Sequence, residues 1–251
     1  RKEGKLLYLM QAHDEATKAS DAKKMVPAVR ADLLRRVNPE QTAGIPAFLP
    51  LYVGMRISLL SKDCVRFGLM KGCTCVVEKV VLADGELLPD KMVAGEPHHL
   101  NYMPVSLLLR AEGAQWTLSS SELPQDLPED MDKRGLFQLR PVYDYLRTRW
   151  EDEWFSVRRT GFRVSPADAM TVYAAQGSTF EAVVADMQRP PNLDTARHWL
   201  ACYVMLSRAK SIEGFLVLRP ATRQELSAKP PQYLLDEIAR LEALEHNTFD
   251  E

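Results

Sequence analysis

The sequence lacks the features that would place it in several large protein classes. No apolar run approaches the roughly 20 residues of a membrane-spanning helix, so an integral membrane protein is not indicated. Only 4 cysteines occur among 251 residues, which fits a reducing compartment better than a disulfide scaffold. The formal net charge is −2, so charge alone does not indicate nucleic-acid binding, and any basic surface must be local. The hydrophobic content of 46% is ample for one large domain or two small ones.

The sequence also lacks the parts that usually bind and cleave a nucleoside triphosphate. It contains no GxxxxGK phosphate loop followed by Ser or Thr, and no acidic pair after a buried upstream strand that could hold magnesium. The chain begins with Arg1 rather than Met. We therefore take it as a fragment, and we expect no ATPase activity from these 251 residues alone.

Residues 165–219 carry the strongest pattern. Capping signals predict a first helix that ends at Gln176. These signals are Ser165 at the N-cap, Pro166 in the first turn, Asp168 in a capping box and Gly177 just past the C-terminal end. The run Val183–Met187 is β-branched and does not alternate, which predicts a buried strand of a parallel sheet.

A second helix and a second strand follow in the same stretch. Asp194 is a good N-cap for a helix over residues 195–206, and Arg208 emerges near the end of that helix. Residues 215–218 form another apolar run that predicts a second buried strand. The order helix, strand, helix, strand predicts an α/β layer.

Two segments of this stretch resemble helicase motifs. Residues 171–180, TVYAAQGSTF, resemble motif V of superfamily one helicases, and residues 203–210, YVMLSRAK, resemble motif VI. Upstream segments fall in the order of the PIF/RecD-like branch, and these are residues 49–57, 68–72 and 158–162. The chain thus resembles the C-terminal part of a superfamily one DNA helicase of the PIF/RecD-like family. Two departures from the family are Tyr173, where His is usual, and Ala174-Ala175, where Lys-Ser or Lys-Ala is common.

The resemblance implies an α/β fold with two parts. Residues 1–49 and 164–251 would form a discontinuous second RecA-like domain of the P-loop NTPase type, with a parallel sheet and flanking helices. Residues 50–163 would form an inserted small β-barrel of the Src-homology type. Short apolar runs between Gly and Pro also favour a small barrel there. The expected strands are Met55–Leu60, Cys73–Val81, Tyr102–Arg110, Trp116–Leu118, Leu136–Arg140 and Trp154–Val157.

The segments at either end of the chain contain further predicted elements. The apolar run Leu6–Met10 predicts a strand, and Pro27 begins a predicted helix that ends at Asn38. A C-terminal helix is expected from Pro231, with an apolar stripe at three-to-four spacing. Nothing on these helices is chemically distinctive, so packing roles are expected for them.

The resemblance also implies roles for individual residues. Arg208 would be the catalytic residue, an arginine finger that stabilises the charge developing on the transferred γ-phosphoryl group. Its place at a helix end beside a parallel sheet is also where ligands bind in open α/β folds. Gln176, Gly177 and Arg208 would contact the nucleotide. The expected nucleic-acid contacts are Thr171, Tyr173, Ser178, Thr179, Arg158 and Arg159. From the residues alone, Arg208 as a helix-end charge and the others as ordinary cap and turn residues remain open.

An aromatic and basic cluster precedes the motif V segment. Its members are Tyr143, Tyr145, Arg147, Arg149, Trp150, Trp154, Arg158 and Arg159. Aromatic rings interleaved with guanidinium groups suit single-stranded nucleic acid. A barrel edge with buried rings and solvated arginines explains the same pattern equally well.

Cysteines and histidines also gather in this half of the chain, at Cys64, Cys73, Cys75, His98 and His99, but their spacing is poor for zinc and we predict no metal site.

The predicted function is that of a motor-domain fragment of an ATP-dependent DNA helicase, with roles such as DNA repair, recombination or telomere maintenance. ATP and Mg²⁺ would be the cofactors, with the metal held mainly by a first RecA-like domain upstream of Arg1. Expected partners are single-stranded or forked DNA and that upstream domain in cis. We expect a monomer without membrane contact, in the nucleus or mitochondrion.

Two alternatives to the helicase motor remain open at this point. One is a nucleic-acid-binding scaffold that has lost catalysis, and the other is a RecD-like motor inside a relaxase or repair nuclease. The sequence upstream of Arg1 discriminates among all three. A phosphate loop there favours a motor, its absence favours the scaffold, and a nuclease domain favours the third possibility.

Overall fold

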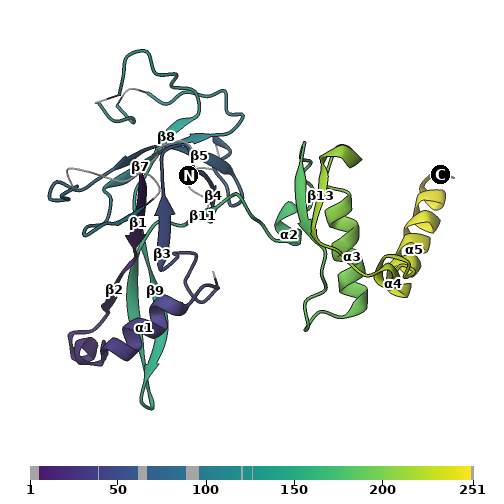
Figure 1. Ribbon diagram of the computed structural model, residues 1–251, viewed down its shortest axis with the longest axis horizontal. Coiled ribbons are helices and arrows are strands. Elements are labelled where there is room, and N and C mark those ends of the chain that lie inside the picture. Colours follow the sequence, from purple (N-terminus) through teal and green to yellow (C-terminus); the bar gives the residue numbers. More distant parts are fainter. Residues whose placement is uncertain are drawn as a thin grey trace. The chain divides into compact units, whose positions relative to one another are not determined.

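The computed structural model describes residues 6–38, 40–61, 67–88, 96–119, 121–125 and 127–249. The chain divides into two compact units, residues 1–169 and residues 170–251 (Figure 1). Within the described ranges, no helix combines the length and apolar composition that crossing a bilayer requires.

The first unit is centred on a five-stranded antiparallel sheet with the strand order β11-β4-β5-β7-β8. The strands are β4 (Arg56–Leu59), β5 (Thr74–Val81), β7 (Ser106–Ala111), β8 (Leu136–Leu139) and β11 (Val164–Pro166). Strand β7 is buried on both faces: Leu107 and Leu109 join the main core, while Leu108 packs with Leu123 and Leu136 in a separate cluster. The sheet is therefore covered on both sides at its centre.

This sheet matches several predicted strands but is not a confirmed barrel. Among the described residues, the end strands β8 and β11 make no ladder with each other, so the sheet is open in its pairing. The expected strand at Trp116–Leu118 is reduced to a single bridge between Thr117 and Arg134. The inserted Src-homology-type barrel therefore stays a prediction.

Two smaller sheets complete the first unit. The first has the order β3-β1-β6, with β1 (Leu7–Gln11), β3 (Phe48–Leu51) and β6 (Pro97–His99), and it contains a parallel pair, β1 with β6. The second has the order β2-β10-β9, with β2 (His13–Ala16), β9 (Val142–Trp150) and β10 (Glu153–Gly161). A 3₁₀ turn, Ala19–Lys24, leads to helix α1 (Pro27–Arg35).

Helix α1 covers one face of the β2-β10-β9 sheet. Val29 and Leu33 of the helix pack with Leu146, Phe155 and Val157 of the hairpin in one buried cluster. The predicted helix at Pro27 is thus confirmed, although it ends at Arg35. Figure 1 shows α1 lying beside the long β9-β10 hairpin.

The division into domains expected from the sequence differs from the observed pairings. Strands β1 and β2 pair with residues 48–51, 97–99 and 157–160, which lie mostly in the expected insertion. The compact units meet at residues 169 and 170 rather than at 163 and 164. The described ladders contain no sheet shared by residues 1–49 and 170–251, and their grouping as one domain stays a prediction.

The second unit is a small α/β layer. Strands β12 (Val183–Asp186) and β13 (Phe215–Arg219) pair in parallel, and helix α3 (Thr195–Leu206) connects the two through the turn Ile212–Gly214. Short helix α2 (Val172–Ala175) precedes β12, and α4 (Arg223–Leu226) and α5 (Gln232–Phe249) follow β13. Asp194 caps α3 as predicted, since its carboxylate accepts a hydrogen bond from the Arg197 amide at 2.8 Å.

The prediction of a helix that begins after Ser165 is wrong. Residues 164–166 instead form β11, which pairs with β4, and the Ala167 amide continues this contact to the Arg56 carbonyl at 2.9 Å. Sheet pairing therefore overrides the local capping signals. Helix α2 is only four residues long and begins after Thr171, whose hydroxyl oxygen accepts from the Ala174 amide at 3.2 Å.

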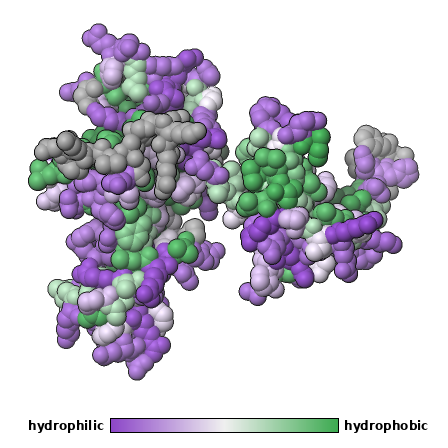
Figure 2. All heavy atoms as spheres, viewed as in Figure 1, coloured by the Kyte–Doolittle hydropathy of each residue, from purple (hydrophilic) through white to green (hydrophobic). Residues whose placement is uncertain are grey.

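The prediction that both strands of the second unit are buried is also wrong. Ala185 is 3% exposed under α3, but Val184, Leu216 and Leu218 are 66%, 64% and 66% exposed. Helix α3 covers only one face of the two-stranded sheet, and Figure 2 shows an apolar patch on the other. Parallel sheets usually have both faces covered, which is why the sequence pattern resembles that of a buried strand.

Candidate functional site

Arg208 joins the end of α3 to the loop after α2. Its Nε donates to the Val204 carbonyl at 3.0 Å, which satisfies one of the unpaired carbonyls at the helix end. One terminal nitrogen donates to the Ser178 carbonyl at 2.8 Å and more weakly to the Ala175 carbonyl at 3.5 Å. The other donates to the Ser207 hydroxyl at 2.8 Å. The half-buried guanidinium therefore holds the motif V loop against the motif VI helix.

Arg208 lies at the amino ends of the parallel strands. Residues Phe180 and Ala209 form a parallel bridge just ahead of β12 and β13, with the Phe180 amide donating to the Arg208 carbonyl at 2.8 Å. The expectation that Arg208 occupies the usual ligand position of an open α/β sheet is wrong, because that position is at the carboxyl ends. Helix α3 runs back along the sheet, so its last residues return to the amino ends.

At the same junction, the backbone of Gly214 lies very close to the backbone of Glu181. A Cβ atom on Gly214 would lie 2.1 Å from the Glu181 carbonyl oxygen, so no larger residue fits without movement. Lys210 forms an ion pair with the Glu181 carboxylate. Motif V and the segment after motif VI therefore meet through main-chain contacts, and Gly214 is a site residue that sequence analysis missed.

The motif V loop presents most of its predicted contact residues to solvent. Gly177 has φ +83°, the left-handed conformation common for a glycine just past a helix end, and Gln176 is the exposed C-cap of α2. Tyr173 is 76% exposed, and Thr179, six residues later, is also exposed. Thr171 uses its hydroxyl oxygen as an acceptor in the N-cap, which leaves its hydroxyl hydrogen available to a phosphate oxygen.

Comparison with known families supports the motif assignment. Residues 166–211 match the family model of the UvrD-like helicase C-terminal domain. This segment is therefore similar to the C-terminal domain of UvrD-like helicases. The resemblance predicted from motifs V and VI is thereby confirmed, and Arg208, Gln176 and Gly177 all fall within the matched range.

Solved structures of Pif1 helicases also align with the chain. Pif1 from Candida albicans aligns with 94% of this chain and 44% of its own length, at 18% identity and a TM-score of 0.49. Bacteroides Pif1 bound to ssDNA aligns with 96% of this chain and 46% of its own length, at 18% identity and a TM-score of 0.47. The chain thus spans less than half of these structures. No curated protein matches it.

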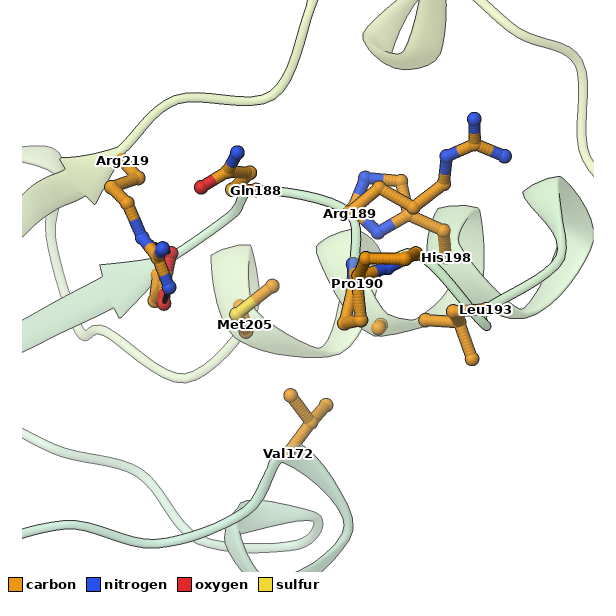
Figure 3. Close-up of a pocket in the computed structure, with 11 residues that line it drawn as sticks. Val172, Gln188, Arg189, Pro190, Leu193, His198, Met205 and Arg219 are labelled. Carbon is orange, nitrogen blue, oxygen red and sulfur yellow. Dashed lines mark hydrogen bonds and ion pairs between the residues drawn. The ribbon is translucent and has the colours of Figure 1, made fainter.

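The carboxyl ends of the strands in the second unit border a different site. A cavity of about 490 Å³ lies there, with Val172 of α2 and Met205 of α3 on opposite sides in Figure 3. The Arg219 guanidinium donates hydrogen bonds to the Asp186 carboxylate and lowers the pKa of that carboxyl below its usual value. Arg189, a second arginine of the lining, pairs with Glu225 at 3.2 Å. Since both arginines have a carboxylate partner, the cavity is not arranged as an anion site.

A buried imidazole, His198, lines this cavity, and a buried thiol, Cys202, lies next to it. His198 is 2% exposed, and its Nε2 lies 3.6 Å from the Cys202 Sγ and 3.9 Å from a Glu225 carboxylate oxygen. Burial raises the pKa of the Cys202 thiol, and the Glu225 charge adds to this. Hydrogen bonds from Thr222 lower the pKa of Glu225. A thiol with a raised pKa is a poor nucleophile, so this group has a packing role.

Two adjacent arginines of β10, both predicted to contact nucleic acid, lie on opposite faces of the strand. Arg158 is on the open face and pairs with Glu15, with side chains 47% and 46% exposed. Arg159 is fully buried and pairs with Asp14. The prediction that Arg159 contacts nucleic acid is therefore wrong, because the guanidinium has no exposed surface.

The cysteines and histidines considered for zinc are only partly described. Cys64 lies outside the described residues. Among those described, no group of three or more His, Cys, Asp or Glu side chains is placed to share a metal ion. The Cys73 and Cys75 sulfur atoms are 3.9 Å apart on the same side of the turn into β5.

Proposed function

We propose that this chain is the C-terminal motor part of an ATP-dependent DNA helicase, which couples ATP hydrolysis to translocation on single-stranded DNA and to unwinding. The observation that carries the proposal is the Arg208 guanidinium, which connects motif VI to the motif V loop inside the matched helicase segment. In this proposal, one residue responds to a nucleotide and moves the loop that contacts DNA.

The residues have distinct roles in this proposal. Arg208 stabilises the charge on the transferred phosphoryl group, and Gln176 and Gly177 line the nucleotide side of the loop. Thr171, Tyr173, Ser178 and Thr179 contact the DNA backbone, where hydroxyl groups donate to phosphate oxygens. The guanidinium fits a phosphate because it already donates to oxygen atoms through both terminal nitrogens. ATP supplies the γ-phosphoryl group, and Mg²⁺ is assigned mainly to an upstream RecA-like domain.

The present contacts of Arg208 set the coupling between the two sites. To reach a phosphate, the guanidinium has to leave the Ser178 and Ala175 carbonyls. A hydrogen bond to a charged group contributes about 1.5–3 kcal/mol, so the phosphate must offer at least this much in exchange. Once Arg208 leaves, the motif V loop loses an anchor, and its contacts with DNA change. Nucleotide binding and DNA binding are then linked through one side chain.

The test is Arg208→Lys in the full-length protein, with Arg223→Lys as the control. Arg223 is an exposed arginine of the same unit, on α4. Lysine keeps the charge but loses the planar fork. We expect single-turnover ATP hydrolysis to fall by about 10³-fold or more, with little change in ATP affinity. DNA affinity should change as well, because the variant loses the contact that anchors the motif V loop at the Ser178 carbonyl. The control should hydrolyse ATP normally.

Retained turnover in Arg208→Lys contradicts the proposal. If Arg208 only stabilises its helix end, the variant should lose about 0.3–1 kcal/mol of stability at most and keep its catalytic rate. Measuring hydrolysis and melting on the same preparations separates these roles.

A second candidate is a nucleic-acid-binding scaffold without catalysis. The observation that favours it is the motif V sequence, in which Tyr173-Ala174-Ala175 replaces the usual His-Lys-Ser pattern and Tyr173 is strongly exposed. An exposed tyrosine suits base stacking and needs no nucleotide. If the full-length protein binds single-stranded DNA but neither binds nor hydrolyses ATP, the scaffold replaces the motor.

A further inference from the structure

Two thiols lie close together where the chain enters strand β5. The Cys73 and Cys75 sulfur atoms are 3.9 Å apart, because residues two apart in an extended segment point to the same side. Cys73 is half-buried, whereas Cys75 is fully buried and belongs to the main core of the first unit. Strand pairing places Cys75 opposite Ile57 of β4 and Ala111 of β7. The sheet therefore fixes one thiol beside the other.

The turn before Cys73 is also fixed by main-chain hydrogen bonds. The Cys73 amide donates to the Met70 carbonyl at 2.9 Å, and the Gly72 amide donates to the Leu59 carbonyl at 2.8 Å. Gly72 has φ +92°, a left-handed conformation that suits glycine. Met70 is 46% exposed, and its side chain has three rotatable bonds. A flexible thioether is thus carried by the residue whose backbone contacts Cys73.

The separation of the two sulfur atoms fits a bridging metal ion better than a disulfide. A disulfide bond is about 2.05 Å long, so the sulfur atoms would have to approach by about 1.9 Å. Same-side neighbours on a strand have Cα atoms about 6.7 Å apart, close to the upper limit for a disulfide. Two thiolate–metal bonds of about 2.3 Å place their sulfur atoms about 3.8 Å apart at a tetrahedral angle and about 4.0 Å apart at a trigonal angle. The observed 3.9 Å lies between these two values.

The available donor atoms favour one kind of metal. Among the described residues, no group of three or more His, Cys, Asp or Glu side chains could hold a metal ion, whereas structural Zn²⁺ almost always has four such ligands. Thiolate and thioether sulfur are soft donors, which select Cu(I). Lys71, exposed in the same turn, can offset the negative charge that two thiolates leave around a monovalent ion. The spacing argument against zinc therefore does not apply to copper.

We propose that Cys73 and Cys75, with Met70 as a third ligand, bind one Cu(I) ion. Each thiol loses its proton to solvent as its sulfur binds the ion, and copper keeps its oxidation state throughout. The bound ion links the turn to β5, so it should raise the melting temperature of the first unit. The proposal goes beyond the proposed motor function and does not depend on it, since the site lies in the first unit and needs no nucleotide.

The test is an anaerobic titration of the complete chain with Cu(I), in competition with the chelator bathocuproine disulfonate. The reference chain and every variant carry Cys64→Ala, because Cys64 lies outside the described residues. We expect one Cu(I) per chain, a thiolate-to-copper charge-transfer band in the ultraviolet and a higher melting temperature. Cys73→Ser should weaken binding by more than about 100-fold, beyond the cost typical for loss of an outer-shell partner. Met70→Leu should weaken binding less, by about 10-fold.

Two variants in the second unit provide matched controls. Met170 is 48% exposed, nearly the same as Met70. Cys202 is a buried thiol that has an imidazole rather than a second thiol beside it. Met170→Leu and Cys202→Ala should bind Cu(I) as tightly as the reference chain. Circular dichroism shows that each variant is folded, and the half-buried position of Cys73 allows serine to replace it without opening the core.

Three results would overturn the proposal. The first is equal Cu(I) affinity of Cys73→Ser and the reference chain. The second is an equal loss of affinity in Cys202→Ala, which would assign the ion to the second unit. The third is tighter binding of Zn²⁺ than of Cu(I), which would indicate nitrogen and oxygen donors rather than sulfur alone. Loss of ATP hydrolysis in Arg208→Lys, by contrast, leaves the proposal unaffected.

Discussion

Replacing Asp14 should destabilise the first unit far more than replacing its neighbour Glu15. The Asp14 carboxylate accepts two hydrogen bonds from the fully buried Arg159, at 2.8 and 2.7 Å. Arg159 also donates to the Leu33 carbonyl at 2.9 Å and so ties α1 to the sheet. Glu15 pairs with Arg158 one residue along the same strand, but that pair is about half exposed. The two pairs thus differ mainly in burial.

The expected magnitudes follow from this difference. Asp14→Asn leaves a buried guanidinium without its counter-charge, which typically costs about 3–5 kcal/mol. Glu15→Gln removes an exposed pair, which typically costs about 0.2–1 kcal/mol. One terminal nitrogen of Arg159 is buried without a partner, so the pair itself is incompletely satisfied. Replacing both members by Leu and Met should therefore recover most of the loss.

Urea unfolding of the complete chain provides the assay. Of the 4 tryptophans, Trp199 alone lies in the second unit, so a Trp199→Phe background makes the fluorescence report on the first unit. With an m value of about 2 kcal/mol/M, Asp14→Asn should lower the midpoint by roughly 1.5–2.5 M. If the midpoints of Asp14→Asn and Glu15→Gln agree within error, burial does not control the energy of these pairs.

Three further predictions concern the second unit. Gly214→Ala should lower its stability by about 1–3 kcal/mol, because the new Cβ meets the Glu181 carbonyl; an unchanged melting curve of the unit's single tryptophan would contradict this. Burial raises the pKa of Cys202, so iodoacetamide at pH 8 should label the half-exposed Cys73 first, as followed by mass spectrometry. Asp194→Ala removes the N-cap of α3 and should lower the free energy of unfolding by about 1 kcal/mol, as measured by thermal unfolding. An unchanged free energy of unfolding would contradict this prediction.

The parts of the fold that the sequence predicts well are those specified by local signals. Helix α3 begins after the Asp194 cap and ends before Ser207 as expected, because both limits depend on neighbouring residues. Each of the motif V and VI segments is a single continuous stretch of sequence, so its resemblance to the helicase motif can be recognised without knowledge of the tertiary structure. Gly177 is a similar case, since its positive φ follows from its place after a helix.

Predictions failed where a distant partner decided the outcome. The capping signals at Ser165 are sound locally, but pairing with β4, more than 100 residues earlier, makes this segment a strand. Arg208 donates to the backbone carbonyls of Ser178 and Ala175. Every residue has a backbone carbonyl, so no sequence motif could predict these contacts. Arg158 and Arg159 are a different case, because strand alternation alone implies that only one of them faces solvent.

The pairing of β2 with β10 has a consequence for synthesis on the ribosome. Asp14 meets Arg159 across a separation of 145 residues, so β2 cannot pair with β10 until the residues between them have been made. At about 5–20 residues per second, this wait lasts roughly 7–30 s. During that time the edge of β2 that later pairs with β10 remains open to chaperones and to other nascent chains. Rare codons between Asp14 and Arg159 would lengthen the wait.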